Sequence, residues 1–258
     1  MKLKQILAAA GAVIAVAVIG WFAYPLLPRE AEAPEPLFAD WAAIVIAGDW
    51  RAQNGQPSEV FDNGRREIAK KLLSIGFRQE NMLQFSVRPN NYPGQEVLPT
   101  TGEAITYGLS NLARKTLGGC LLYITSHGTQ QGIIVGNRLV DPPPMADLID
   151  VACGDRPSVA VISSCFAGQF IGAMKGPKRI ILTAARGDRT SFGCGEQDEF
   201  TFFDVCIIQQ IDQSSNFSEL ATRVDACVAK RETEMKVEQP SEPQFWLGPE
   251  VAYTLNWK

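Results

Sequence analysis

Two residues of this chain, His127 and Cys165, are of the types that together perform nucleophilic catalysis. His127 is the only histidine, and it follows the apolar run in "CLLYITSHGTQQG" at 120–132. Cys165 follows a second apolar run, in "VAVISSCFAG" at 159–168. A thiol needs a base to become a thiolate at neutral pH, and an imidazole is the usual base. The pair could therefore attack a carbonyl carbon if the fold brings them together.

The elements around these residues predict such a meeting. Apolar runs typical of buried strands alternate with amphipathic helical stretches, which predicts a mostly parallel α/β sheet with helices on both faces. The expected strands are 41–49, 82–89, the run before His127, 158–165 and 179–185, and the expected helices are 58–77, 100–119, a short one after 142–144 and parts of 199–236. Parallel strands end at the same edge of a sheet, where ligands bind. We therefore expect both residues at that edge.

Local signals mark two further boundaries. Thr100 and Glu103 have the spacing of a capping box at the start of the second helix. Gly136-Asn137, inside "GIIVGNRLVD", is typical of a hairpin turn. These signals predict a helix start near residue 100 and a hairpin over 132–141.

Gly128 and Cys165 could supply the N–H groups that stabilise an oxyanion, because Gly128 lets a substrate backbone approach closely. In the expected reaction Cys165 forms a thioester, and His127 acts first as general base and then as the acid that protonates the leaving amine. Ser126, Ser163 and Ser164 are alternative nucleophiles, but "SSCFAG" lacks the GxSxG pattern. A lone histidine or cysteine is more often structural, so the joint pattern carries this interpretation.

The blocks "YITSHGTQQGIIV" and "VAVISSCFAGQFI" resemble the His-Gly and Ala/Ser-Cys blocks of the legumain-like cysteine peptidases, which are relatives of caspases. The resemblance extends from "WAAIVIAGD" to "SEPQFWLG", about residues 40–250. It implies a caspase-like three-layer α/β/α sandwich, a His127/Cys165 dyad, an oxyanion site at Gly128 and Cys165, and no cofactor. The asparagine that assists the histidine in this family is not evident near 58–62, so we expect a backbone carbonyl to orient His127.

The resemblance also implies a pocket for the substrate residue before the cleaved bond (the P1 residue). Legumains that favour asparagine use an Arg-His pair, a Glu two residues before the nucleophile, and a later Asp. An ungapped comparison puts Asp62 and Asn63 at the pair, Ser163 at the Glu, and Asp204 near the Asp. A pocket with two acids favours Arg or Lys as the P1 residue. Alternatively, Asp62 merely starts a helix and Asp204 is a solvated helix residue.

The composition argues against other classes of partner. A net charge of −4 without a basic cluster argues against nucleic acid, and no spacing of cysteines or histidines predicts a metal site. If Cys165 is a free thiol, the other five cysteines cannot all pair, and their connectivity stays open. Cys120 and Cys206 lie in apolar runs and are interpreted as buried small hydrophobic residues, while a bridge at Cys194 is left open.

The N-terminal segment predicts a membrane anchor. Residues 6–27 are almost wholly apolar, and a spanning helix needs about 20 such residues. Lys2 and Lys4 precede this run, so the positive-inside rule places the rest of the chain outside the cytoplasm. A signal peptide cleaved near "AEA" at 31–33, giving a secreted domain, is the alternative. We expect a transmembrane helix in 1–28, a linker over 29–39, and an extracytoplasmic peptidase domain over 40–258.

These observations together predict a cysteine endopeptidase that acts on polypeptides and is anchored to a membrane. Two alternatives stay open. A transamidase would use the same dyad but resolve the thioester with an amine, and a catalytically silent scaffold would bind peptides at the edge of the sheet. The sequence predicts no oligomeric state.

Overall fold

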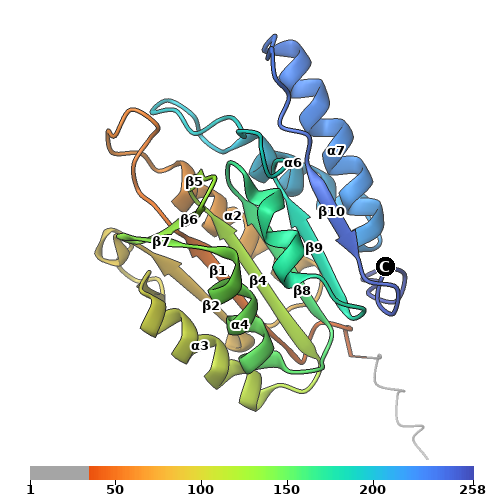
Figure 1. The fold of residues 1–258 in the computed structure, drawn as a ribbon. Helices are drawn as coiled ribbons and strands as arrows, with labels where there is room; N and C mark the ends of the chain where they lie inside the picture. Colours follow the sequence, from red (N-terminus) through yellow and green to blue (C-terminus); the bar gives the residue numbers. More distant parts are fainter. Residues whose placement is uncertain (1–34) are drawn as a thin grey trace, which may run out of the picture. The chain divides into compact units, whose positions relative to one another are not determined.

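A seven-stranded sheet forms the middle layer of the fold, in the order β10-β9-β8-β4-β1-β2-β3 (Figure 1). Its strands are β1 (Trp41–Ala47), β2 (Met82–Ser86), β3 (Val97–Pro99), β4 (Gly119–Thr125), β8 (Ser158–Ser163), β9 (Arg179–Thr183) and β10 (Gln244–Leu247). All neighbouring strands run parallel except β9 and β10. The mostly parallel sheet is therefore confirmed, whereas the short edge strand β3 was not predicted.

Residues 35–258 are the part of the chain that this computed structural model describes. The predicted transmembrane helix and most of the predicted linker lie outside the described residues. Within residues 35–258, no helix has the length and apolar character required to cross a membrane.

Helices cover both faces of the sheet and complete the three layers (Figure 1). One face carries α2 (Val60–Ser74), α6 (Phe202–Gln210) and α7 (Phe217–Glu234), and the other carries α3 (Gly102–Lys115), α4 (Pro142–Cys153) and α5 (Ile171–Met174). Successive side chains of a strand point to opposite faces. Val45 of β1 accordingly joins one hydrophobic core, and its neighbour Ile44 joins the other.

A small second sheet follows β4 and consists of β5 (Gly128–Thr129), β6 (Gly132–Val135) and β7 (Arg138–Val140). The antiparallel pairing of β6 with β7 confirms the predicted hairpin, and Gly136 in its turn has a φ of 63°, a conformation that favours glycine. This sheet carries the chain away from the carboxyl end of β4.

The capping box predicted at Thr100 is wrong by one residue. Thr101 caps α3, because its side chain accepts a hydrogen bond from the N–H of Ala104 at 3.1 Å. The Thr100 hydroxyl donates instead to the carbonyl of Ala47 at 2.9 Å, which ties the start of α3 to the end of β1. Tertiary contact, rather than local spacing, decides which threonine is the cap.

Two disulfides correct the interpretation of Cys120 and Cys206. Both are buried, but Cys120 is bonded to Cys153 and joins β4 to α4, while Cys206 is bonded to Cys227 and joins α6 to α7. The free cysteines of the described chain are Cys165 and Cys194.

The folded unit begins earlier than the predicted boundary at residue 40. It starts at Pro36, and Phe38 is fully buried. The Phe38 ring stacks on Phe77 at 4.7 Å and meets the edge of Trp41 at 5.1 Å between ring centroids. The end of the predicted linker is therefore part of the core.

Candidate active site

The register of β4 and β8 brings the ends of these two strands to one level. Thr125 pairs with Ser163, so His127 and Cys165 each lie two residues beyond a paired position. The N–H of Ser126 also donates to the carbonyl of Ser163 at 3.0 Å. The two predicted residues therefore leave the sheet side by side.

Close packing joins the two segments further out. A Cβ on Gly128 would lie only 2.1 Å from the carbonyl oxygen of Cys165, so any side chain there would separate the segments. The Gln169 amide donates to the carbonyl of Thr129 at 2.7 Å and to that of Phe166 at 2.9 Å. These contacts fix the loop after β4 against the turn after β8.

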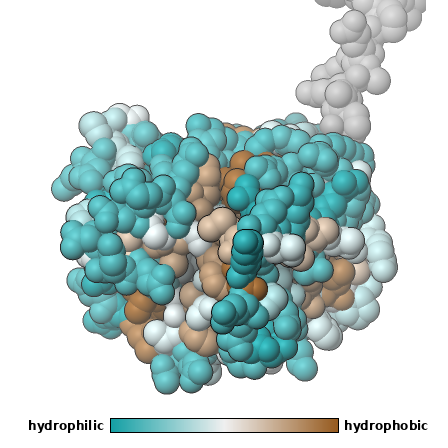
Figure 2. All heavy atoms as spheres, turned by 90° about the horizontal axis from the view of Figure 1, so that it is seen from above, coloured by the Kyte–Doolittle hydropathy of each residue, from teal (hydrophilic) through white to brown (hydrophobic). Residues whose placement is uncertain are grey.

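Both segments line one cavity of about 400 Å³. Its lining is Gln53, His127, Gly128, Cys165, Phe166, Thr190, Ser191, Phe192, Gly193, Cys194, Gly195 and Asp198. Figure 2 views the molecule from above Figure 1 and shows hydrophobic side chains across the middle of this face between hydrophilic flanks. The cavity has room for a substrate side chain next to Cys165.

His127 is oriented by a backbone carbonyl, in agreement with the expectation from the missing asparagine. Its Nε2 lies 2.9 Å from the carbonyl oxygen of Arg51. A carbonyl only accepts, so Nε2 carries the proton and Nδ1 of the neutral ring is free to accept another. The ring also meets Phe61 edge-on, with the centroids 5.0 Å apart.

Cys165 stands in a sharp turn. The next residue, Phe166, has a φ of 58°, a left-handed conformation that is uncommon for any residue but glycine. The Phe166 N–H donates to the carbonyl of Arg189 at 2.7 Å, which holds the turn in place. Such strain at a nucleophile is common where a side chain must project from the end of a strand.

The Cys165 sulfur lies against Ser191. The Ser191 N–H donates to Sγ at 3.3 Å, and Sγ is 3.6 Å from the Ser191 carbonyl oxygen and 3.7 Å from its hydroxyl. Ser191 thus both donates to the sulfur through its N–H and accepts from the thiol through its carbonyl. Ser191 is therefore a contact of the thiol that the motif comparison did not predict.

The two N–H groups predicted for an oxyanion, those of Gly128 and Cys165, have no hydrogen-bond acceptor among residues 35–258. Gly128 and Ile133 form a non-hydrogen-bonded pair of β5 and β6, because the carbonyl of His127 accepts from the N–H of Ile134 instead. The Gly128 N–H therefore points away from β6.

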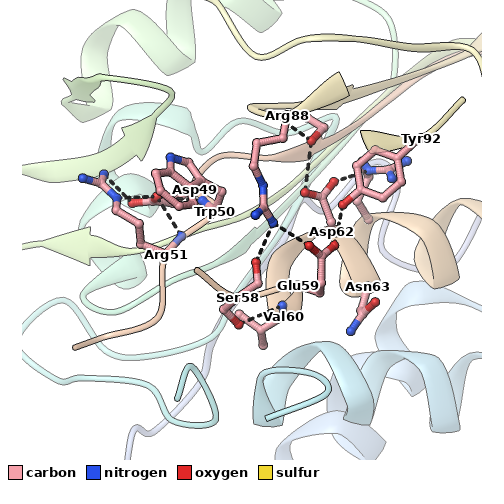
Figure 3. A network of polar contacts seen from close by, with 12 residues as sticks. Asp49, Trp50, Arg51, Ser58, Glu59, Val60, Asp62, Asn63, Arg88 and Tyr92 are labelled. Atoms are coloured by element: carbon pink, nitrogen blue, oxygen red, sulfur yellow. Dashed lines mark hydrogen bonds and ion pairs between the residues drawn. The ribbon is translucent and has the colours of Figure 1, made fainter. Parts of the chain in front are cut away.

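Asp62 lies in the first turn of α2 and is buried, away from the cavity lining. Its carboxylate accepts from Arg65 Nε at 2.9 Å and from the Ser86 hydroxyl at 3.0 Å (Figure 3). Asn63 projects elsewhere, donating to the carbonyl of Glu199 at 3.0 Å. These contacts occupy Asp62 within the fold.

Asp204 is fully buried, so the alternative that it is a solvated helix residue is wrong. It accepts from the hydroxyls of Tyr123 and Thr125, both at 2.6 Å, and burial raises the pKa of its carboxyl above the usual value. Ser163 is also buried, with its hydroxyl 3.2 Å from that of Thr201. Neither residue lines the cavity.

The loop after β9 supplies several further residues of the cavity lining. It contributes Ser191, Phe192 and Asp198, whose carboxylate accepts from the N–H of Gly195 at 2.6 Å. It also contributes Cys194, where burial, with Cys165 and Asp198 nearby, raises the thiol pKa to about 11. The loop follows a parallel strand that ends at the same edge of the sheet as β4 and β8, and this position in the sequence indicates that it borders the site. Over the described range 35–258, no three or more His, Cys, Asp or Glu side chains gather where they could hold a metal ion.

A thiol and an imidazole line one cavity at the carboxyl edge of this mostly parallel sheet, an arrangement consistent with the class of cysteine peptidases. The family model for the Peptidase C13 family matches residues 67–248. The chain therefore belongs to the Peptidase C13 family, the legumain family, and is a cysteine-type peptidase, a hydrolase whose substrates are polypeptides.

The solved structures agree on the fold. Among 264 matching chains is the crystal structure of Caspase-1 from Spodoptera frugiperda, with a TM-score of 0.56 and 15% identity over 85% of this chain and 92% of that chain. At this identity the likeness shows the fold alone, and it confirms the predicted caspase-like architecture. No curated protein sequence matches the chain significantly.

Proposed function

We propose that the protein is an endopeptidase in which Cys165 is the nucleophile and His127 the general base and acid. The observation that carries this proposal is the shared cavity at the ends of β4 and β8, which both side chains line. The orientation of His127 by the Arg51 carbonyl supports it, because Nδ1 is left free to take a proton.

In the proposed reaction, Cys165 Sγ attacks the peptide carbonyl carbon while His127 Nδ1 takes the thiol proton. The carbonyl oxygen becomes an oxyanion that accepts from the N–H groups of Gly128 and Cys165. The C–N bond then breaks, and His127 gives its proton to the leaving amine. Water, deprotonated by His127, attacks the thioester and releases the acid and the free thiol.

The proposed P1 residue is Arg or Lys, and the acid that supports this preference is Asp198. It is the only Asp or Glu among the residues that line the cavity, which has no Lys or Arg in its lining. Asp62 and Asp204, the two acids that the sequence predicts for this pocket, have partners of their own and lie outside the cavity. A cationic side chain would meet one uncompensated carboxylate there.

We also propose that the peptidase domain works outside the cytoplasm, held by the N-terminal segment. The two disulfides support this location, because disulfides persist in oxidising compartments. Protease protection of the domain in intact cells, with and without permeabilisation, would test the location and the anchor together.

A fluorogenic peptide library that varies the P1 residue tests the dyad. The full chain should cleave it, and Cys165→Ala and His127→Ala should each lower kcat/KM by at least about a thousandfold. Ser164→Ala, which removes the neighbouring hydroxyl, should retain activity. Loss of cleavage in Ser164→Ala with Cys165→Ala active would contradict the proposal. A ligated product with an added amine nucleophile, found by mass spectrometry, would indicate transamidation.

Asp198→Asn tests the acidic cavity. An exposed ion pair contributes up to about 1 kcal/mol, so the preference for Arg over Gln as the P1 residue should fall about fivefold. Glu199→Gln makes the same change of charge one residue away, outside the cavity lining, and should leave the preference intact. Equal effects of the two variants, or a wild type that prefers Asn, would refute the assignment.

A further inference from the structure

Asp49, immediately beyond the end of β1, has a buried carboxylate that is bonded entirely to its own turn. Oδ1 accepts from the N–H of Trp50 at 2.7 Å and from the N–H of Arg51 at 3.2 Å. The Arg51 guanidinium adds two bonds, from Nε to Oδ1 and from Nη2 to Oδ2, each of 2.9 Å (Figure 3). The Asp49 side chain is only 2% exposed, whereas that of Arg51 is 42% exposed. The Asp49 carboxylate is thus hydrogen-bonded to both the backbone N–H and the guanidinium of Arg51.

This turn is also attached to the segment that carries His127. The N–H of Gly48 donates to the carbonyl of Thr125 at 2.9 Å, which holds the end of β1 to the end of β4. A Cβ on Gly48 would lie 2.6 Å from the Ser126 hydroxyl oxygen, so the two segments are in close contact. The position of the Arg51 carbonyl relative to His127 therefore depends on the turn that Asp49 closes.

The Arg51 carbonyl decides which nitrogen of His127 carries the proton. A neutral imidazole exists as two tautomers, and only the Nε2–H form leaves Nδ1 able to accept a proton. The 2.9 Å contact from Nε2 to the Arg51 oxygen favours that form. Were the turn to relax, the carbonyl would no longer select between the tautomers.

We propose that Asp49 is a positioning residue of the active site, which acts through the Arg51 carbonyl to hold His127 in the Nε2–H tautomer. This inference rests on the proposed function, because it takes His127 as the general base. Asp49 does not line the cavity that Cys165 lines, and instead lines a neighbouring cavity with Arg51 and His127. Asp49 affects the fraction of molecules in which His127 is in the Nε2–H tautomer and can accept a proton at Nδ1. Loss of Asp49 should therefore change kcat more than KM.

The single histidine of the chain makes a direct test available. In full chain labelled with ¹⁵N-histidine, the ring gives one pair of nitrogen signals, whose shifts report the tautomer. Wild type should show Nε2 protonated and Nδ1 unprotonated when the ring is neutral. Asp49→Ala should move both signals towards an average of the tautomers and lower kcat about tenfold, with KM within twofold of wild type.

Two further variants separate positioning from a purely structural role. Asp49→Asn keeps an oxygen for the two N–H groups, so it should restore most of the wild-type spectrum and of kcat. Asp40→Ala removes a carboxylate that accepts the N–H of Leu117 at 3.0 Å, at the opposite end of β1. This matched control should leave the histidine spectrum and kcat unchanged.

Arg51→Ala keeps the inference testable if Asp49→Ala does not fold. It removes the two guanidinium bonds and keeps the carbonyl, so we expect a smaller shift of the spectrum and about a threefold fall in kcat. A folded Asp49→Ala or Arg51→Ala variant with the wild-type spectrum and kcat would overturn the inference. Failure of the wild type to cleave any peptide would instead contradict the proposed function, while the nitrogen spectra would still decide how His127 is held.

Discussion

Two free thiols line the same cavity, and the residues around each one set its chemistry. Cys165 accepts the N–H of Ser191 and directly precedes Phe166, whose left-handed conformation makes a sharp turn at the end of β8. Cys194 is half-buried, and burial beside Cys165 and Asp198 raises its pKa to about 11. The thiolate is the reactive form of cysteine, so a raised pKa makes a thiol inert near neutral pH.

Limiting iodoacetamide should therefore modify Cys165 and spare Cys194 at pH 7.5. With a pKa of about 11, fewer than about one Cys194 in a thousand is a thiolate at that pH, and the fraction rises as the pH approaches 11. Peptide mapping by mass spectrometry across this pH range would follow both residues. Cys165→Ala should take up almost no label at pH 7.5, and equal labelling of Cys194 there would contradict the assignment.

At the scale of the elements, the parallel pairing of β4 with β8 does most to create the site. It pairs Thr125 with Ser163, so the residues that follow the two strands leave the sheet at the same height. Helix α6 is hydrogen-bonded to the end of β4, because the carboxylate of Asp204 accepts from the hydroxyls of Thr125 and Tyr123. The Cys206–Cys227 disulfide in turn fastens α6 to α7.

Removal of that disulfide should lower the free energy of unfolding. For a sequence separation of 21 residues, the loop-closure model predicts a loss of about 3 kcal/mol, because the unfolded chain regains conformational freedom. Urea denaturation of the Cys206→Ala/Cys227→Ala double variant, compared with oxidised wild type, would measure it. An unchanged midpoint and slope would show that the bridge adds nothing to the free energy of unfolding.

At the scale of the whole folded unit, an aromatic cluster joins its first residues to its last. Phe38 contacts Phe77 and Trp41, and it also meets Phe217 and Trp257, with ring centroids 6.0 and 6.2 Å away. Residues that precede β1 are therefore part of the hydrophobic core, which explains why the folded unit begins at Pro36.

Phe38→Ala should destabilise the fold strongly. Truncating a buried phenylalanine costs about 3–5 kcal/mol, because apolar contact is lost and a cavity remains. Leu37→Ala is the matched control, since Leu37 is 46% exposed and its loss should change the free energy of unfolding by about 0.5 kcal/mol or less. Chemical denaturation of both variants would measure the difference, and similar losses would mean that Phe38 is not a core residue.

The sequence by itself determined the layered α/β fold and the edge of the sheet at which His127 and Cys165 lie. Buried parallel strands are recognisable as short apolar runs, and parallel strands must end at one edge. Residues two positions beyond two such strands therefore share that edge, but they are neighbours only because the strand order places β8 beside β4. The need for a backbone carbonyl beside His127 also followed, from the missing asparagine.

Only the tertiary structure decided which carbonyl that is, how the cysteines pair and what the acids do. The Arg51 carbonyl lies 76 residues before His127, and Asp204 lies 81 residues after Tyr123. No local pattern encodes such contacts, because they depend on how loops and helices pack across the sheet. Burial decides what an acidic side chain does. Asp62 and Asp204, which the sequence predicted to bind a cationic substrate side chain, are buried and hydrogen-bonded within the fold. Asp198, which lies in an irregular loop, lines the cavity instead.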